Sequence, residues 1–340
     1  MIVAGRNIAP MPQNLPKLPP RSRHWSDLIT TDFATLDLAR AIAVLPLGAT
    51  EQHGPHLPLS VDANLAHSMV QIAATHLPPD LPALFLPVQR IGYSPEHTAF
   101  AGTLSLKAET VMRLWTDIAE SVSASGVNKL VLFNTHGGHV GLMDVVAREL
   151  RTRLGMLVYG VSWFNLPLKS PDGEDLMTRF SADEQRFGVH GGQIETAMML
   201  ALKPRLVRQS KAQDFASSSQ QRARDFALLG NGKSAKLAWA AQDLNPDGAA
   251  GNASAANVDD GLALVDAASA RAFSSCARCC SVGVAGFSRA SNGKNACRID
   301  ATAVWSLPIV RLARSDTIDS PPGTRIGLLT APGGINCTTR

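Results

Sequence analysis

The sequence predicts a three-layer α/β/α fold with a mainly parallel sheet. Two periodicities alternate along the chain: short apolar runs of strand length, and longer segments in which apolar residues recur with helical spacing. Strands that alternate with helices favour a parallel sheet covered by helices on both faces. The 340 residues are enough for one large α/β domain or two small ones.

The elements follow in this order. Four segments have the length and composition of buried strands: 41–47, 83–88, 129–133 and 156–161. Helical spacing occupies the segments between and after them, with two further helices near the end: 64–76, 108–125, 140–154, 192–202, 223–229 and 261–273. In such sheets the ligand crevice lies beyond the carboxyl ends of the strands. Residues that bind a ligand are therefore expected in the segments that follow each strand.

Composition narrows the class of protein. Hydrophobic residues make up 45% and charged residues 18%, the balance of a globular protein. The net charge of +4 is scattered rather than gathered into a basic run, which argues against a nucleic-acid partner. No run reaches the roughly 18 apolar residues of a membrane helix, and the N-terminus has no apolar signal region. We expect a cytoplasmic enzyme without a membrane partner.

The two ends differ from the middle. Residues 1–24 are rich in proline and predict a flexible arm, which leaves 25–273 as the folded domain. Residues 274–340 carry every cysteine of the chain and predict an atypical tail, either frame-shifted or disordered: Cys276, Cys279, Cys280, Cys297 and Cys337. Because no second Cys pair or nearby His completes a four-ligand zinc site, we assign the tail no catalytic role.

The densest chemical signal follows the first strand, in residues 48–62. Glu51 and His53 are two apart and project to the same side in extended backbone, and Gly54 with two prolines bends the chain so that Asp62 can return to them. Carboxylates and imidazole suit a pair of divalent cations. The alternative is a polar loop in which Asp62 is the N-cap of the next helix.

A second cluster follows the third strand, where His136 and His139 flank a Gly-Gly pair that allows close approach of backbone to a ligand. A Gly-Gly turn that merely opens a helix is the alternative. In a third cluster, His190 precedes Glu195 by five residues at the start of a helix, where a carboxylate is also good helix electrostatics. The histidines make the functional interpretation the stronger one in both places.

Three more residues, together with His139 of the second cluster, are candidates for contact with a polar substrate. Ser94 and His97 lie in the segment after the second strand and offer hydroxyl and imidazole groups. Trp163 follows the fourth strand and could line the substrate pocket, with plain core packing as the alternative.

Taken together, the strings LPLGATEQHGPHLPLSVD, SPEHTAFAGTLSL, NTHGGH and HGGQIET resemble, in order and spacing, the motifs of the creatininase family of amidohydrolases. The resemblance covers residues 25–273 and implies a three-layer α/β fold, hexamers and two divalent cations at the carboxyl ends of the strands. It implies that Glu51, Asp62 and His136 hold one cation. His53 and the bridging Asp62, with a further carboxylate, would hold the other.

The chain departs from this pattern in an informative way. Creatininase itself carries a Glu two residues after the motif histidine, where this chain has Gly138. Gly-Gly members of the family draw instead on the Glu of the third motif, here Glu195, so the chain resembles the mycofactocin-type peptidases and formamidopyrimidine deformylases more than creatininase. His139 replaces the usual Asn and either adds a ligand or fills the Asn role.

These inferences predict a metal-dependent amidohydrolase. We expect two cations of Zn, Mn or Fe, with His190 delivering a proton to the leaving nitrogen and Glu195 serving both metal binding and catalysis. The expected substrate is a small cyclic or formylated amide, and a homo-oligomer, a hexamer by resemblance, is the expected assembly. The alternatives are a peptidase acting on a short modified peptide and a metal-binding protein without catalysis.

Overall fold

A computed structural model describes residues 20–281 of the chain. At its centre lies a four-stranded parallel sheet in the order β2-β1-β3-β4. The strands are β1 (Ile42–Leu47), β2 (Ala83–Phe85), β3 (Lys129–Asn134) and β4 (Leu157–Ser162). Each crossover between them contains a helix or a long loop, as parallel pairing requires. The predicted sheet is confirmed.

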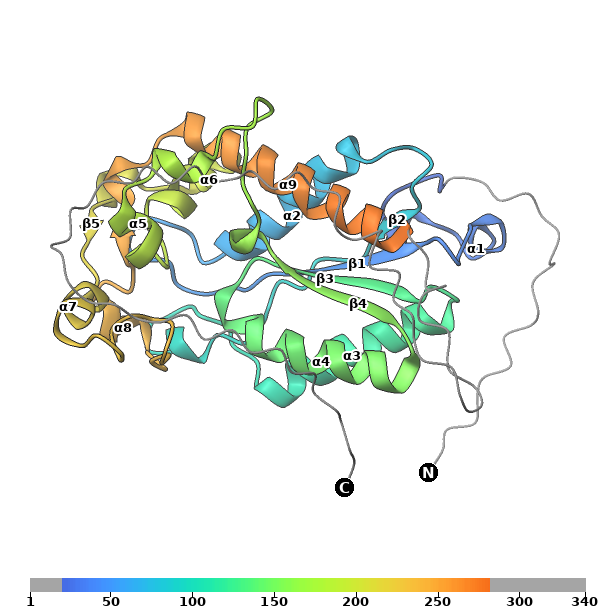
Figure 1. The fold of residues 1–340 in the computed structure, drawn as a ribbon, viewed down its shortest axis with the longest axis horizontal. Helices are drawn as coiled ribbons and strands as arrows, with labels where there is room; N and C mark the ends of the chain where they lie inside the picture. Colours follow the sequence, from blue (N-terminus) through green and yellow to red (C-terminus); the bar gives the residue numbers. More distant parts are fainter. Residues whose placement is uncertain (1–19, 282–340) are drawn as a thin grey trace, which may run out of the picture. The chain divides into compact units, whose positions relative to one another are not determined.

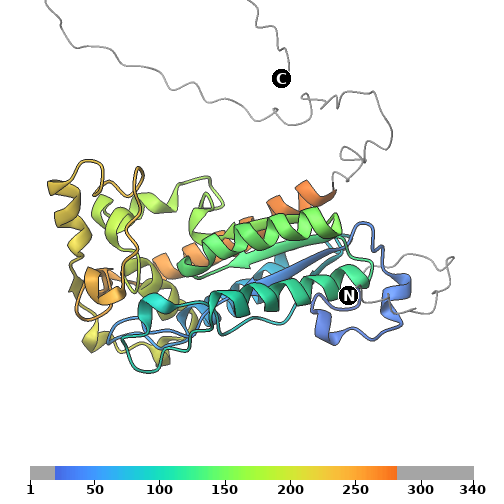
Figure 2. The same cartoon turned by 90° about the horizontal axis from the view of Figure 1, so that it is seen from below.

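Helices cover both faces of this sheet (Figure 1). One face carries α2 (Val61–His76), α6 (Gln193–Leu202) and α9 (Val258–Ser281), which contact one another. The other carries α3 (Ala108–Ala124) and α4 (Val140–Leu154), which pack side by side and stand in front of the strands in Figure 2. The three predicted layers are therefore present.

Two hydrophobic cores result from the alternation of side chains along each strand. Ile42 and Val44 of β1 point into the core beneath α2, α6 and α9. Ala43 and Leu45 point into the core beneath α3 and α4. Successive strand residues face opposite sides of a sheet, so a strand buried on both faces is apolar throughout.

Smaller elements complete the described part of the chain. α5 (Ala182–Phe187), α7 (Ser218–Asp225), α8 (Ala241–Leu244) and β5 (Asp214–Phe215) lie at one end of the sheet, and α1 (Asp32–Thr35) lies at the other (Figure 1). β5 pairs antiparallel with β6 (Gly251–Asn252). Single-turn 3-10 helices are formed by Trp25–Asp27, Pro95–His97, Gly137–His139, Trp163–Asn165, Leu176–Arg179, Pro204–Leu206, Gln209–Lys211 and Ala253–Ala255.

Some boundaries differ from the predicted ones. The second strand ends at Phe85 rather than at 88, because Pro87 has no N–H for a regular ladder. The helix expected at 223–229 is wrong in its second half. α7 ends at Asp225, and Phe226 and Leu228 are 53% and 68% exposed, so these apolar residues contact no core that would extend the helix.

The ends of the predicted domain are only partly visible. Residues 1–19 of the predicted arm and 282–340 of the predicted tail lie outside the described residues, so both boundaries stay predictions. α9 starts at Val258 and continues to Ser281, beyond the expected end at 273. Among residues 20–281, the helices are all too short or too polar to cross a membrane.

Candidate metal centre

Four segments bring ligand-type side chains to the carboxyl edge of the sheet. Glu51 and His53 follow β1, and His136 follows β3, whose last residue pairs in register with the last residue of β1. Asp62 lies in the first turn of α2 rather than at its N-cap, which is Ser60. Glu195 lies in the first turn of α6.

Their ligand atoms form two overlapping triplets. In one, Glu51, Asp62 and His136 bring one atom each to within 4.8 Å of one another; in the other, His53, Asp62 and Glu195 do so. His136 Nδ1 is 3.2 Å from Glu51 Oε1 and 4.0 Å from Asp62 Oδ2. His53 Nε2 is 3.7 Å from Asp62 Oδ2 and 3.9 Å from Glu195 Oε2. Asp62 belongs to both triplets.

Several of these atoms are buried without a hydrogen-bond partner. Among the described residues, both carboxylate oxygens of Glu51, Nε2 of His53 and Oδ2 of Asp62 are in this state. The short distance from Glu51 to His136 is poorly aligned and does not count as a hydrogen bond. Unsatisfied buried polar atoms are rare in folded proteins, so four in one cluster indicate missing partners. Divalent cations fit this oxygen and nitrogen donor set.

Backbone carbonyls fix the orientation of two histidine rings. His53 Nδ1 lies 3.1 Å from the carbonyl oxygen of Glu51, and His136 Nε2 lies 2.9 Å from that of Tyr93. Each of these nitrogens therefore carries its proton and donates it to the carbonyl, which leaves the other nitrogen free to face the cluster. This is the arrangement that histidine ligands of metals adopt.

Charges within the cluster shift several pKa values. Burial raises the pKa of Asp62 well above its ordinary value, and the neighbouring Glu51 charge adds to the rise. Burial opposes the charged form of His136, but Glu51, Asp62 and Glu96 together outweigh it and raise the pKa of His136 to about 10. Burial lowers the pKa of His53 to about 4. Without a cation, the carboxylates of the cluster thus favour the protonated form of His136, whereas His53 is neutral at pH 7.

A protein-family model described as creatininase, creatinine amidohydrolase, matches residues 26–276. The chain belongs to the creatininase family. It is 34% identical over 171 residues to the mycofactocin precursor peptide peptidase of Mycobacterium tuberculosis strain H37Rv, covering 48% of this chain and 60% of that protein. It is 30% identical over 181 residues to the creatinine amidohydrolase of Pseudomonas putida, covering 49% and 66%. The aligned region thus spans about three fifths of the first of these relatives.

Solved structures of creatininases share the fold. A mutant creatininase described as Zn-Zn type superposes with a TM-score of 0.58 at 24% identity, covering 73% of this chain and 95% of that one. A creatininase described as the Mn form gives 0.57 at 23% identity, with the same coverage.

His190 has the same two-ended arrangement as His53 and His136, the candidate ligand histidines of this creatininase-family chain. Its Nε2 donates to the carbonyl oxygen of Gln52 at 2.7 Å, and its Nδ1 faces Glu51 Oε1 at 3.9 Å. The ring lies between those of His53 and His97, with centroids 4.1 and 4.2 Å away. Burial lowers the pKa of His190 to about 4. Glu51, His53 and His190 form a third possible ligand triplet, so position alone does not separate ligand from proton carrier.

The predicted substrate contacts Ser94 and His97 are enclosed next to the cluster. Ser94 is fully buried, and its hydroxyl lies 3.4 Å from His136 Nε2. His97 Nδ1 accepts from the Gln52 side chain at 2.8 Å, so its protonated Nε2 faces Glu51 Oε1 at 3.4 Å. Both residues are placed to hold the ligands Glu51 and His136 in position. A direct role in substrate contact does not follow from this geometry.

His139 is also fully enclosed. Its Nδ1 donates to the side-chain oxygen of Asn134 at 3.2 Å, and its Nε2 accepts from the backbone N–H of Tyr93 at 3.1 Å. Because both ring nitrogens are engaged, none remains for a metal or a substrate. Of the two roles left open by the sequence, the geometry fits the Asn-like one.

Trp163 differs from these three residues. It is 4% exposed and packs in the core beneath α2, α6 and α9, yet its indole Nε1 has no hydrogen-bond partner among the described residues. The Trp163 side chain is thus packed in the core, while its indole N–H is available as a hydrogen-bond donor.

Sequence reasoning missed Gln52 and Glu96. The Gln52 side chain donates to the carbonyl of Gly248 at 2.8 Å and links it to His97. Alternation places position 52 opposite Glu51 and His53, so nothing in the pattern singled it out. Glu96 Oε1 lies 3.7 Å from His136 Nε2, and a Cβ at Gly138 would come within 2.6 Å of that oxygen. The Glu found at this position in creatininase would therefore collide with Glu96 here.

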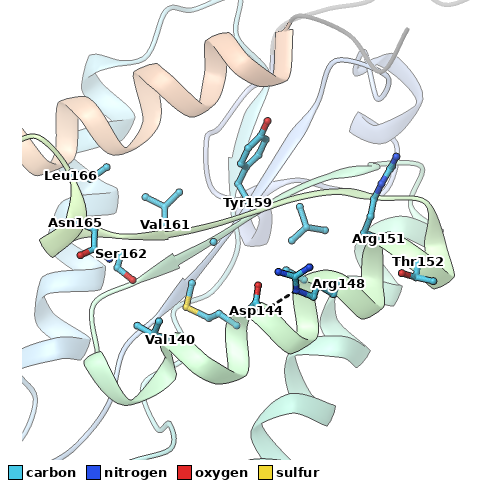
Figure 3. Close-up of a pocket in the computed structure, with 14 residues that line it drawn as sticks. Val140, Asp144, Arg148, Arg151, Thr152, Tyr159, Val161, Ser162, Asn165 and Leu166 are labelled. Atoms are coloured by element: carbon cyan, nitrogen blue, oxygen red, sulfur yellow. Dashed lines mark hydrogen bonds and ion pairs between the residues drawn. The ribbon is translucent and has the colours of Figure 1, made fainter. Parts of the chain in front are cut away.

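A separate groove of about 850 Å³ runs between α4 and β4 (Figure 3). Its lining mixes aliphatic side chains, such as Val140 and Val161, with polar and charged ones, and Asp144 and Arg148 form a 2.9 Å ion pair along its α4 side. It contains no residue of the ligand triplets. The candidate metal centre at the carboxyl edge of the sheet is therefore separate from this groove.

Proposed function

We propose that the chain hydrolyses a C–N amide bond with the help of two divalent cations. The observation that carries this proposal is the pair of ligand triplets that share Asp62, with four of their buried atoms unpaired. Membership of the creatininase family supports the reaction class. Two of its relatives are named for action on creatinine and on a precursor peptide, both of which contain amide bonds.

Glu51, Asp62 and His136 would hold one cation, and His53, Asp62 and Glu195 the other. Zn, Mn or Fe suits this mixture of imidazole and carboxylate, and solved relatives are described as Zn-Zn and Mn forms. Bound there, two cations would polarise the amide carbonyl and make water acidic enough to attack near neutral pH.

His190 is our candidate for moving the proton. Its Nδ1 faces the cluster and its pKa, lowered by burial, keeps the ring neutral at pH 7, so Nδ1 is free to accept a proton from the attacking water. The charges of Glu51 and Glu195 favour the protonated ring that results. That ring can then pass the proton to the leaving nitrogen. Glu195 therefore serves both a cation and the proton carrier.

The expected substrate is a small cyclic or formylated amide. Glu195 is 16% exposed while Glu51, His53 and Asp62 are at most 2% exposed, so the open side of the cluster lies at α6. Trp163 Nε1 is our candidate donor for a polar group of that substrate. A second candidate is a short modified peptide, favoured by the 34% identity to a precursor-peptide peptidase. A metal-binding protein without catalysis is the third.

One experiment separates the three. The purified chain is analysed for bound metal by mass spectrometry and then assayed on cyclic amides, formamides and short peptides. Two bound cations per chain with turnover of a cyclic or formylated amide support the first candidate, and turnover of peptides alone supports the second. Stoichiometric metal without turnover on any substrate would support the third and overturn the proposed hydrolysis.

We also propose a cytoplasmic homo-oligomer, a hexamer by family resemblance. Light scattering on the purified chain measures the assembly, and a monomer at micromolar concentration would contradict it.

A further inference from the structure

Glu184 of α5 is a buried carboxylate that the proposed chemistry does not use. It is 4% exposed, and no cation pairs with it among the described residues. Its Oε1 accepts the backbone N–H of Gln193 at 2.7 Å, and its Oε2 accepts that of Asn252 at 2.8 Å. Burial raises the pKa of Glu184, and these backbone donors act in the opposite direction. Hydrogen bonds of this kind to a carboxylate are among the stronger ones in proteins.

Three glycines surround this carboxylate. A Cβ at Gly188 would lie 2.3 Å from Glu184 Oε1, and one at Gly192 would lie 2.5 Å from the same atom. A Cβ at Gly251 would lie 2.7 Å from Oε2. A side chain at any of these three positions would therefore collide with the Glu184 carboxylate, which explains why Gly188, Gly192 and Gly251 are glycines.

The two bonds connect the carboxylate to the candidate metal centre. Gln193 is the first residue of α6, which carries Glu195, and a carboxylate at a helix N-terminus also interacts well with the helix dipole. On the other side of the turn, the Ala250 N–H donates to the carbonyl of His190 at 2.7 Å. The segment from His190 to Glu195 is thus held at both ends against residues 250–252. Within it, Glu195 Oε2 accepts the N–H of Gly191 at 2.6 Å.

We propose that Glu184 is a positioning residue that holds Glu195 and His190 at the metal centre. The proposal rests on the proposed function for the role of those two residues. Its specific consequence concerns the two cations. The site of His53, Asp62 and Glu195 depends on the placement of α6, whereas the site of Glu51, Asp62 and His136 draws on no residue that Glu184 holds. Loss of Glu184 should therefore weaken one cation site and spare the other.

A double-mutant cycle tests the contact without reference to metal. The three atoms nearest to a Cβ at Gly188 all belong to the Glu184 carboxylate, and φ of Gly188 is −79°, which any residue adopts. Gly188→Ala should lower the Tm by about 4 °C or more in the wild type and by almost nothing in a Glu184→Ala background. Gly141→Ala is the matched control, since a Cβ there meets nothing within 4 Å. Equal losses in both backgrounds would overturn the assignment.

Metal titration of Glu184→Gln tests the functional part. The amide has the shape of the carboxylate, but its NH₂ group faces one of the two backbone N–H donors and cannot accept a hydrogen bond from it. This variant also provides the test if Glu184→Ala fails to fold. We expect one of two cations to bind roughly 10- to 100-fold more weakly and the other to be unchanged. Asp183→Asn, on the exposed neighbour, should change neither. Equal weakening of both cations, or of neither, would overturn the positioning role. If the wild type binds no cations, the proposed function is overturned instead. The double-mutant cycle would still test the contact between Glu184 and Gly188.

Discussion

The candidate metal centre is built from two kinds of segment. In the loop after β1, residues 51–62, ligand atoms of Glu51, His53 and Asp62 are buried and unpaired. In residues 188–195, which run into the first turn of α6, the carboxylate of Glu195 already accepts the Gly191 N–H. His190 donates to the Gln52 carbonyl through Nε2 as His53 donates to the Glu51 carbonyl through Nδ1, so the two segments differ in their carboxylates and not in their histidines.

This difference separates binding from positioning. A buried unpaired carboxylate is costly, so the cluster of Glu51 and Asp62 gains stability when a cation supplies the missing partner. The turn at 188–195 gains its order from backbone hydrogen bonds and needs no cation for it. We infer that metal affinity resides mainly in the first segment and catalytic geometry mainly in the second.

Replacement of Asp62 should give the largest effect. Asp62→Ala removes the ligand that belongs to both triplets, so both cations should be lost and turnover with them. Metal analysis of the purified variant measures this directly. His67→Ala, on an exposed position of the same helix, is the control and should keep full metal content. Retention of either cation at wild-type affinity by Asp62→Ala would show that Asp62 does not bridge.

Replacement of His190 tests the second segment. His190→Ala should lower turnover by roughly 10² to 10⁴ fold, the usual contribution of a positioned acid or base, with bound metal nearly unchanged. The Glu51, His53 and His190 triplet provides the opposite expectation. If His190→Ala loses metal as completely as Asp62→Ala does, His190 is a ligand and the division between the two segments fails at this residue.

The pH dependence of cation binding sharpens the comparison further. In the cation-free protein, Glu51 and the other neighbouring carboxylates raise the pKa of His136 to about 10, so at pH 7 the ring is protonated and must lose its proton to bind a cation. His53, with its pKa lowered to about 4 by burial, is already neutral. Affinity should therefore rise as pH increases from 7 toward 10, by up to about tenfold per pH unit for one released proton.

Calorimetry in two buffers of different ionisation enthalpy measures that proton release. His136→Ala should remove it, along with much of the affinity of the first site. A binding constant that is flat between pH 7 and 9 would contradict the assigned protonation of His136.

The sequence predicted the architecture well because strands and helices here obey their periodicities. β1 is apolar throughout and β3 is apolar from Leu130 to Phe133, as expected of strands covered on both faces, and the parallel sheet then places Glu51 and His136 at one edge. It could not predict orientation. His136 and His139 are three residues apart in one motif, yet one ring faces the cluster and the other is enclosed between Asn134 and Tyr93.

Contacts across long separations were equally invisible. Glu184 meets Asn252, which lies 68 residues away, and Gln52 meets His190 at a separation of 138. No local pattern marks such residues, since their neighbours in space are set by how the helices pack. The roles expected for Ser94 and His97 had the same weakness, because residue type and proximity to a strand end do not tell whether a side chain opens to solvent.

The smallest effect is expected from removal of residues 282–340. The ligand triplets found within residues 20–281 all lie between Glu51 and Glu195, and the last residue of either described core cluster is Ala268. A chain ending at Ser281, where α9 ends, should therefore keep its Tm within about 2 °C and bind as many cations as the full chain. Thermal unfolding and metal analysis of both forms measure this. Because α9 continues past residue 273, Ser281 is a better end point than the boundary predicted from sequence. Loss of soluble protein on this truncation would show that the segment after α9 belongs to the fold. A lower metal content would show that this segment supplies ligands beyond those of residues 51–62 and 188–195.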